Sequence, residues 1–122
     1  MDIKVRHAQN VTILEVAGSL DISNAHEMRQ VVVETITADS AQVVVNLHDL
    51  CSVDSSGLAA IVQGLKRARE QQGNLSLCSL QPPVRMILEL TRFDKVFDIF
   101  ISEEEAVLAS ARQYKPRTSV EF

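Results

Sequence analysis

The strongest constraint on the fold is the alternation of two kinds of apolar pattern along the chain. Short β-branched runs, of which residues 43–47 (Val-Val-Val-Asn-Leu) are the clearest, have the length and composition of buried strands. Between such runs lie longer segments whose apolar residues recur at helical spacing, as at Leu58, Ile61, Val62, Leu65 and Ala68. This alternation predicts an α/β layer whose strands are mostly parallel and joined by right-handed crossovers.

The boundaries of these elements follow from turn and capping residues. We expect strands at 3–7, 11–17, 42–47, 75–80 and 96–101, with Gln9-Asn10 as a hairpin turn that makes the first pair antiparallel. Four helices are expected to begin near 24, 55, 82 and 102. Asn24 with Glu27, and Ser102 with Glu105, have capping-box spacing, and Gly73 is placed to end the second helix as its C′ residue.

Length and charge restrict the classes of protein to be considered. The chain has 122 residues, so we expect one domain over 1–112 and, because 113–122 lacks periodicity, a loose tail there. A net charge of −4 without a basic block argues against nucleic acid or an anionic membrane as the main partner. No signal peptide is apparent, and Cys51 and Cys78 are too few for a disulfide framework. We therefore expect a cytoplasmic protein whose thiols are reduced and most simply act as small buried hydrophobes.

The segment Asp54-Ser55-Ser56-Gly57 lies where the loop after a strand becomes the start of a helix. Free backbone N–H groups and the positive end of the helix dipole meet there. Two interpretations are open. Asp54 or Ser55 could be an ordinary N-cap, or the segment could present Ser56 to a kinase as a phosphorylation switch.

Enzymatic and metal-binding alternatives have less support. Ser56 as a nucleophile needs a base, but neither His7, His26 nor His48 has a sequence signature linking it to Ser56, and the Gly-x-Ser-x-Gly elbow is absent. No cysteine or histidine pair has the spacing of a zinc site, and no glycine-rich phosphate loop occurs. We therefore expect neither catalysis nor a cofactor or metal.

Ligands of α/β sheets usually bind beyond the carboxyl ends of the strands, where Asp21, residues 53–57 and residues 79–83 are expected to meet. We interpret this edge as a protein-binding face. A phosphoryl group on Ser56 would add roughly −1.5 to −2 charges, which a helix N-terminus tolerates but a partner surface built for the neutral hydroxyl does not. In this hypothesis Asp54 orients the hydroxyl, Ser55 caps the helix and Gly57 leaves room for a kinase.

Four elements in order carry a resemblance to a known family: Gly18-Ser19-Leu20-Asp21, the valine-rich strand, Asp54-Ser55-Ser56-Gly57-Leu58 and Arg92-Phe93-Asp94-Lys95-Val96-Phe97. The series resembles the anti-sigma factor antagonists, single-domain STAS proteins of bacterial partner switching, from the first strand to about Ala111. The resemblance implies a mixed sheet of four to five strands with four helices. It also implies phosphorylation at Ser56 and partner binding through Asp21, Asp54, Ser55, Ser56, Gly57 and Leu58.

The same resemblance implies the partners. An unphosphorylated antagonist would bind an anti-sigma factor that is also a serine kinase and so free a sigma factor for transcription. Phosphorylation of Ser56 would end the complex, and a metal-dependent serine phosphatase would restore it. The alternative is a STAS module that is not phosphorylated and serves as a scaffold or as a small-ligand sensor. The sequence predicts nothing about the oligomeric state.

Overall fold

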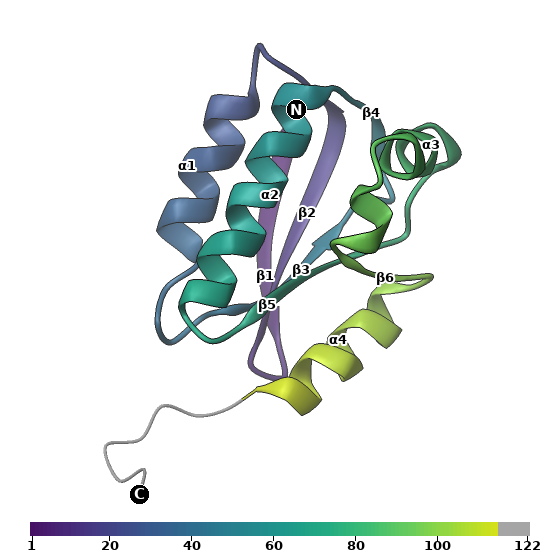
Figure 1. The fold of residues 1–122 in the computed structure, drawn as a ribbon. Coiled ribbons are helices and arrows are strands. Elements are labelled where there is room, and N and C mark those ends of the chain that lie inside the picture. The colour runs from purple at the N-terminus through teal and green to yellow at the C-terminus, as the bar shows by residue number, and fades with distance from the viewer. Residues whose placement is uncertain (115–122) are drawn as a thin grey trace, which may run out of the picture.

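The computed structural model describes residues 1–114, which form a mixed sheet and the helices that cover it (Figure 1). In α1 the stripe that helical spacing predicts is buried, since Ala25, Met28 and Val32 all lie in the core. The elements of this part of the chain, in order, are β1 (Asp2–Ala8), β2 (Val11–Leu20), α1 (Ala25–Thr35), β3 (Gln42–Asn46), β4 (Leu50–Val53), α2 (Ser55–Glu70), β5 (Asn74–Cys78), α3 (Pro82–Leu90), the 3-10 helix η1 (Phe93–Lys95), β6 (Asp98–Phe100) and α4 (Glu103–Gln113).

The sheet has the order β1-β2-β3-β5-β6, with β4 paired to β2 off this path. Strands β1 and β2 are antiparallel through the hairpin at Gln9-Asn10, whose positive φ angles fit the expected turn. The β2–β3, β3–β5 and β5–β6 pairs are parallel. The expected mixed α/β fold with four helices is confirmed, and its sheet contains one strand more than the upper end of the expected range.

Two apolar layers cover opposite faces of the sheet. Because side chains alternate along a strand, Val43 and Val45 belong to the large cluster beneath α1, α2 and α3, whereas Val44 belongs to a smaller cluster. That smaller cluster includes Ala106 and Val107 of α4. Figure 1 shows α1 and α2 side by side over one face, with α4 on the other side of the sheet.

The strand that the sequence did not predict is β4. It pairs in parallel with the end of β2, where Ser19 lies opposite Ser52 and Leu20 opposite Val53. Strand β2 therefore continues through Gly18 instead of ending there, with a register shift between Gly18 and Ser19. Gly18 has a φ of 95°, which favours glycine, and it marks a bulge rather than a strand end. The last strand is also shorter than expected, because Val96 and Phe97 belong to the turn that ends η1 and donate their N–H groups to Phe93 O.

Of the two capping boxes expected, one is confirmed and the other is wrong. Ser102 accepts a hydrogen bond from the Glu105 N–H and caps α4 as expected. Asn24 does not cap α1 with its side chain, because its amide instead donates to Ser19 O and its Oδ1 accepts from Asp21 N. After α2 the left-handed residue is Gln72, not Gly73.

Gly73 is required there for a different reason. A Cβ on Gly73 would lie 1.9 Å from the Ala41 carbonyl oxygen, so the glycine permits a close backbone approach. The two cysteines also differ: Cys78 is buried as expected, whereas Cys51 is exposed, because β4 turns it outward. Residues 115–122 of the expected tail lie outside the described residues, and none of the helices within 1–114 has the length and apolar character to span a bilayer.

Candidate functional site

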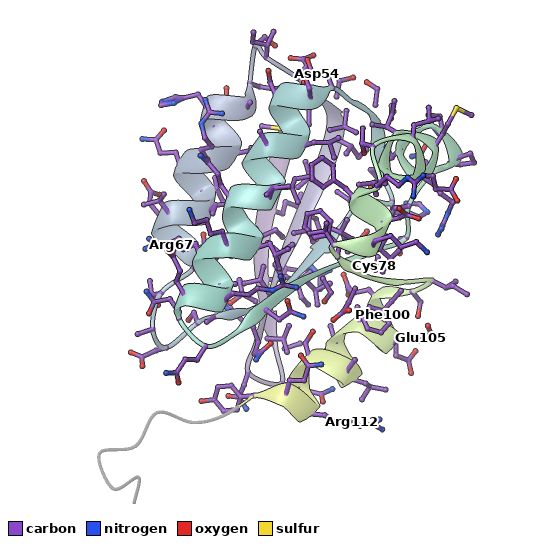
Figure 2. All side chains as sticks on the ribbon, in the orientation of Figure 1. Asp54, Arg67, Cys78, Phe100, Glu105 and Arg112 are labelled. Atoms are coloured by element: carbon purple, nitrogen blue, oxygen red, sulfur yellow. The ribbon has the colours of Figure 1, made fainter. Side chains whose placement is uncertain are left out.

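The site is built around Asp54, which lies at the start of α2 (Figure 2). Its Oδ1 accepts a hydrogen bond from Gly57 N at 2.9 Å, so Asp54 is the N-cap. Its Oδ2 accepts from Ile22 N at 3.1 Å, and its own N–H donates to Leu20 O at 3.1 Å. One side chain therefore caps α2 and ties it to the segment after β2, which corrects the expectation that Ser55 caps the helix.

Gly57 lets the helix approach β2 closely. A Cβ at this position would lie 2.5 Å from Leu20 O, 2.7 Å from Leu20 Cγ and 2.9 Å from Val53 Cγ2. The glycine therefore faces inward, and the expectation that it leaves room for a kinase beside Ser56 is wrong. Leu58, only 3% exposed, lies in the core next to it. Gly57 and Leu58 position the site from beneath and offer little surface to a partner.

Ser55 and Ser56 are the first two residues of α2. Ser55 is exposed and Ser56 is half-buried. Within residues 1–114 neither hydroxyl makes a hydrogen bond, because the capping contact is made by Asp54. The site thus presents two unengaged hydroxyls on a helix end whose backbone is fixed by its neighbours.

Asp21 lies on the loop that Asp54 holds, as its place after Gly-Ser-Leu led us to expect. Its Oδ1 accepts hydrogen bonds from the Ser23 hydroxyl and the Ser23 N–H. These bonds, the hydroxyl first, lower the pKa of the Asp21 carboxyl below its usual value. Asp21 therefore adds a second acidic side chain on the loop that Asp54 ties to the start of α2.

An apolar groove begins at the site and runs between α2 and α3; we call it the α2–α3 groove. Its volume is about 630 Å³, and it is lined by Val53, Asp54, Ser55, Leu58, Ala59, Val62, Gln63, Ile87, Thr91 and Phe93. A second hollow, lined by Ser52, Val53, Pro82, Pro83, Met86 and Ile87, adjoins it. On α3, Met86 is 58% exposed and Leu90 is 74% exposed. Exposed apolar surface of this kind marks interaction sites.

Sequence reasoning missed the groove because helical spacing does not separate a core residue from one that lines a groove. Ile87 is spaced like the buried Val84 and Leu88, but it is only half-buried. The outward Met86 and Leu90 were the available signal, since both interrupt what would be the polar face of an amphipathic helix.

The alternative catalytic and metal residues do not converge on Ser56. His48 is exposed and contacts Asp49, whereas His7 contacts Thr12 and His26 is exposed on α1. Among residues 1–114, no group of three or more histidine, cysteine or acidic side chains is arranged to hold a metal ion. Of the residues singled out by sequence, the structure brings together Asp21, Asp54, Ser55 and Ser56, with Gly57 and Leu58 beneath them.

Comparison with known proteins gives a consistent result. The family model described as the STAS domain matches residues 2–106. The chain is 28% identical over 108 residues to the anti-sigma F factor antagonist of Paenibacillus polymyxa, covering 88% of this chain and 92% of that protein. It is 25% identical over 107 residues to the anti-sigma-B factor antagonist of Bacillus subtilis, covering 88% and 97%. A solved anti-sigma-factor antagonist (STAS) domain protein from Planctomyces limnophilus superimposes with a TM-score of 0.80 at 27% identity, covering 91% and 99%.

Proposed function

The chain belongs to the STAS domain family, and on this premise we propose that it is an anti-sigma factor antagonist. In this proposal the chain is a regulator that acts by binding another protein, and it is not itself an enzyme. Its unphosphorylated form binds an anti-sigma factor that is also a serine kinase, and this frees a sigma factor. Phosphorylation of Ser56 ends the complex, and a metal-dependent serine phosphatase restores it. The names of the relatives from Paenibacillus polymyxa and Bacillus subtilis support the antagonist class.

The proposal rests on the Ser56 hydroxyl, which makes no hydrogen bond within residues 1–114. It stands on a helix end that Asp54 holds through its bonds to Gly57 N and Ile22 N. A structural cap would use its hydroxyl to accept a backbone N–H, but Asp54 already fills that role through Gly57 N. Ser56 is therefore free to act as a phosphoacceptor without loss of the cap. Asp54 fixes the backbone on which Ser56 stands, which is a positioning role.

The charges at the site support a switch in binding rather than in folding. A phosphoryl group adds roughly −1.5 to −2 charges. At position two of α2 it meets the positive helix end and the unpaired N–H groups of the first turn, so the fold survives. The same group adds to the negative charge of Asp54, two residues away, and of Asp21 on the loop that Asp54 holds. A partner that fits the neutral hydroxyl then faces added bulk and repulsion.

The α2–α3 groove supplies the apolar part of the proposed partner surface. The groove shares Asp54 and Ser55 with the site. A protein that reaches Ser56 therefore also covers the end of the groove that these two residues line. Interfaces need such apolar centres next to polar contacts. The partner-binding residues in the proposal are accordingly Asp21, Asp54, Ser55 and Ser56, with Gly57 and Leu58 holding them in place. The proposal assigns the domain to residues 1–112 and places the protein in the cytoplasm, where sigma factors act.

The test begins with phosphosite mapping by mass spectrometry on protein from cells that make it, with phosphatases inhibited. Phosphate on Ser56 whose occupancy changes with growth condition supports the switch. The co-purifying partner is then tested against variants with ATP present. Ser56→Ala is expected to stay bound, whereas Ser56→Asp is expected to bind at least about tenfold more weakly, or about 1.4 kcal/mol, with an unchanged circular dichroism spectrum.

The matched control is Ser55→Ala, which removes the neighbouring hydroxyl and should behave like the native chain. If Ser56→Ala and Ser56→Asp bind the partner as the native protein does, the switch is refuted. Complete coverage of the Ser56 peptide without phosphate in any condition favours the alternative, a STAS module that binds constitutively as a scaffold or small-ligand sensor.

A further inference from the structure

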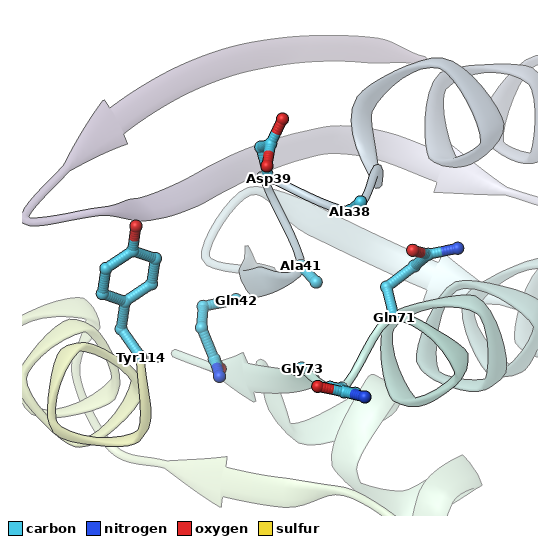
Figure 3. Close-up of a pocket in the computed structure, with 8 residues that line it drawn as sticks. Ala38, Asp39, Ala41, Gln42, Gln71, Gly73 and Tyr114 are labelled. Atoms are coloured by element: carbon cyan, nitrogen blue, oxygen red, sulfur yellow. The ribbon is translucent and has the colours of Figure 1, made fainter. Parts of the chain in front are cut away.

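A polar pocket lies at the end of the molecule opposite the proposed switch. The switch is at the N-terminus of α2, whereas Gln71, Gln72 and Gly73 at its C-terminal end line the pocket. The intervening helix has 16 residues, a length of about 24 Å. Figure 3 shows the pocket, with Gln42 between Tyr114 and Gly73, and with Ala38, Asp39 and Ala41 along the facing wall.

The side chain of Gln42 is the unusual feature of this pocket. It is only 6% exposed, although glutamine is rarely buried. Its Nε2 donates to Gln113 O at 3.3 Å, but its Oε1 is buried and has no hydrogen-bond partner among residues 1–114. An acceptor left unpaired in this way costs free energy, because it has given up its hydrogen bonds to water and gained none in the protein. A ligand that donates a hydrogen bond to Oε1 would recover that cost.

The shape of the site indicates the size of such a ligand. The inner cavity, which Gln42 lines, has a volume of about 40 Å³ and accommodates a head group of one or two heavy atoms. A second cavity of about 330 Å³ adjoins it and is lined by His7 to Thr12, Ser40 and the two residues shared by both cavities, Asp39 and Tyr114. A narrow donor head can therefore enter while a longer body stays in the outer cavity.

The charge of the lining indicates the chemistry of the ligand. Among the described lining residues, Asp39 is the only acidic one and no lysine or arginine occurs. Three glutamine amides and a tyrosine supply the rest of the polar surface of the inner cavity. Anions would meet the Asp39 carboxylate without a lysine or arginine to offset its charge, whereas an ammonium group would pair with it and donate several N–H bonds.

We propose that this pocket binds a small primary amine, whose ammonium group donates to Gln42 Oε1 beside the Asp39 carboxylate and whose alkyl body lies in the outer cavity. The site is independent of Ser56 and of the proposed function, since it shares no residue with the α2–α3 groove.

The experiment uses the full-length, ¹⁵N-labelled protein and 1,4-diaminobutane as the probe, followed by two-dimensional NMR. The Gln42 side-chain amide and the Tyr114 backbone amide should shift saturably, with a dissociation constant in the range of roughly 1–10 mM that suits so small a ligand. Resonances of Ser55, Ser56 and Gly57 should not move. Glutarate, which has two carboxylates and a similar length, should produce no shift.

Two variants and a matched control complete the test. Gln42→Leu and Asp39→Asn should each weaken binding of the probe at least tenfold, and Asp39→Asn alters only an exposed side chain, so it remains informative if Gln42→Leu unfolds the protein. Gln63→Leu makes the same chemical change in the α2–α3 groove and should leave probe binding unchanged. The proposal is overturned if no resonance shifts saturably up to roughly 100 mM probe, if glutarate moves the same resonances, or if both pocket variants bind like the native chain. A crystal structure grown with the probe that shows only an ordered water against Gln42 Oε1 would also overturn it.

Discussion

Replacing Gly57 by alanine tests whether the site depends on close contact between α2 and β2. The added Cβ would lie 2.5 Å from Leu20 O, a backbone atom, and 2.7 Å and 2.9 Å from side-chain carbons of Leu20 and Val53. None of these neighbours is the free end of a long side chain, so α2 has to move away from β2. Overpacking of this kind costs about 1–3 kcal/mol.

Gly64→Ala in the same helix is the matched control. Its Cβ would lie 2.9 Å from Leu75 Cδ1 and 3.3 Å from Val32 Cγ2, which are terminal methyl groups that can shift. The substitution also gains about 1 kcal/mol of helix propensity, because Gly64 is in the helix interior. We therefore expect Gly64→Ala to stay within about 1 kcal/mol of the native free energy of unfolding.

The assay is urea unfolding monitored by circular dichroism, with thermal unfolding as a second measure. For a chain of 122 residues, each kcal/mol corresponds to about 4 °C in Tm, so Gly57→Ala should lower Tm by roughly 4–12 °C. In addition, the Ile22 amide should exchange its hydrogen faster, since its bond to Asp54 depends on the same approach. The reasoning is refuted if Gly57→Ala is as stable as the native chain, or if Gly64→Ala is the less stable variant.

Three further predictions concern single contacts. Asp54→Ala should lower the free energy of unfolding by about 0.5–2 kcal/mol, and Asp54→Asn by less because its Oδ1 still accepts from Gly57 N; equal losses in urea titrations would contradict the capping role. Burial raises the pKa of the Cys78 thiol to about 11, whereas an unfolded thiol titrates near pH ~8.5. The free energy of unfolding should therefore fall as pH rises from about 8.5 towards 11, because the unfolded thiol ionises first. In Cys78→Ala, urea titrations across this pH range should no longer show that fall. Arg6 bonds Glu15 and Glu103 at the surface, so Arg6→Ala should lower the free energy of unfolding by no more than about 1 kcal/mol. A larger loss in urea titrations would show that the Arg6–Glu103 pair holds α4 in place.

Patterns within a few residues determined most of the fold. Alternation and helical spacing located four helices and five of the strands, because burial of one face imposes a period on the sequence itself. Ser102 could also be identified as a cap from the sequence, because its partner Glu105 is only three residues away. The position of the Asp54–Gly57 segment at a helix start also followed from local signals.

The tertiary structure decided which of these residues act together. Strand β4 is short and pairs with β2 across some thirty residues of sequence, so no local period reveals it. The bond from Ile22 to Asp54, the close approach at Gly57, the groove between α2 and α3 and the bond from Gln42 to Gln113 each join segments that are far apart in the chain. Local propensity is set by neighbours along the chain, whereas a binding surface is set by neighbours in space, and these are brought together only when the sheet and its covering helices have formed.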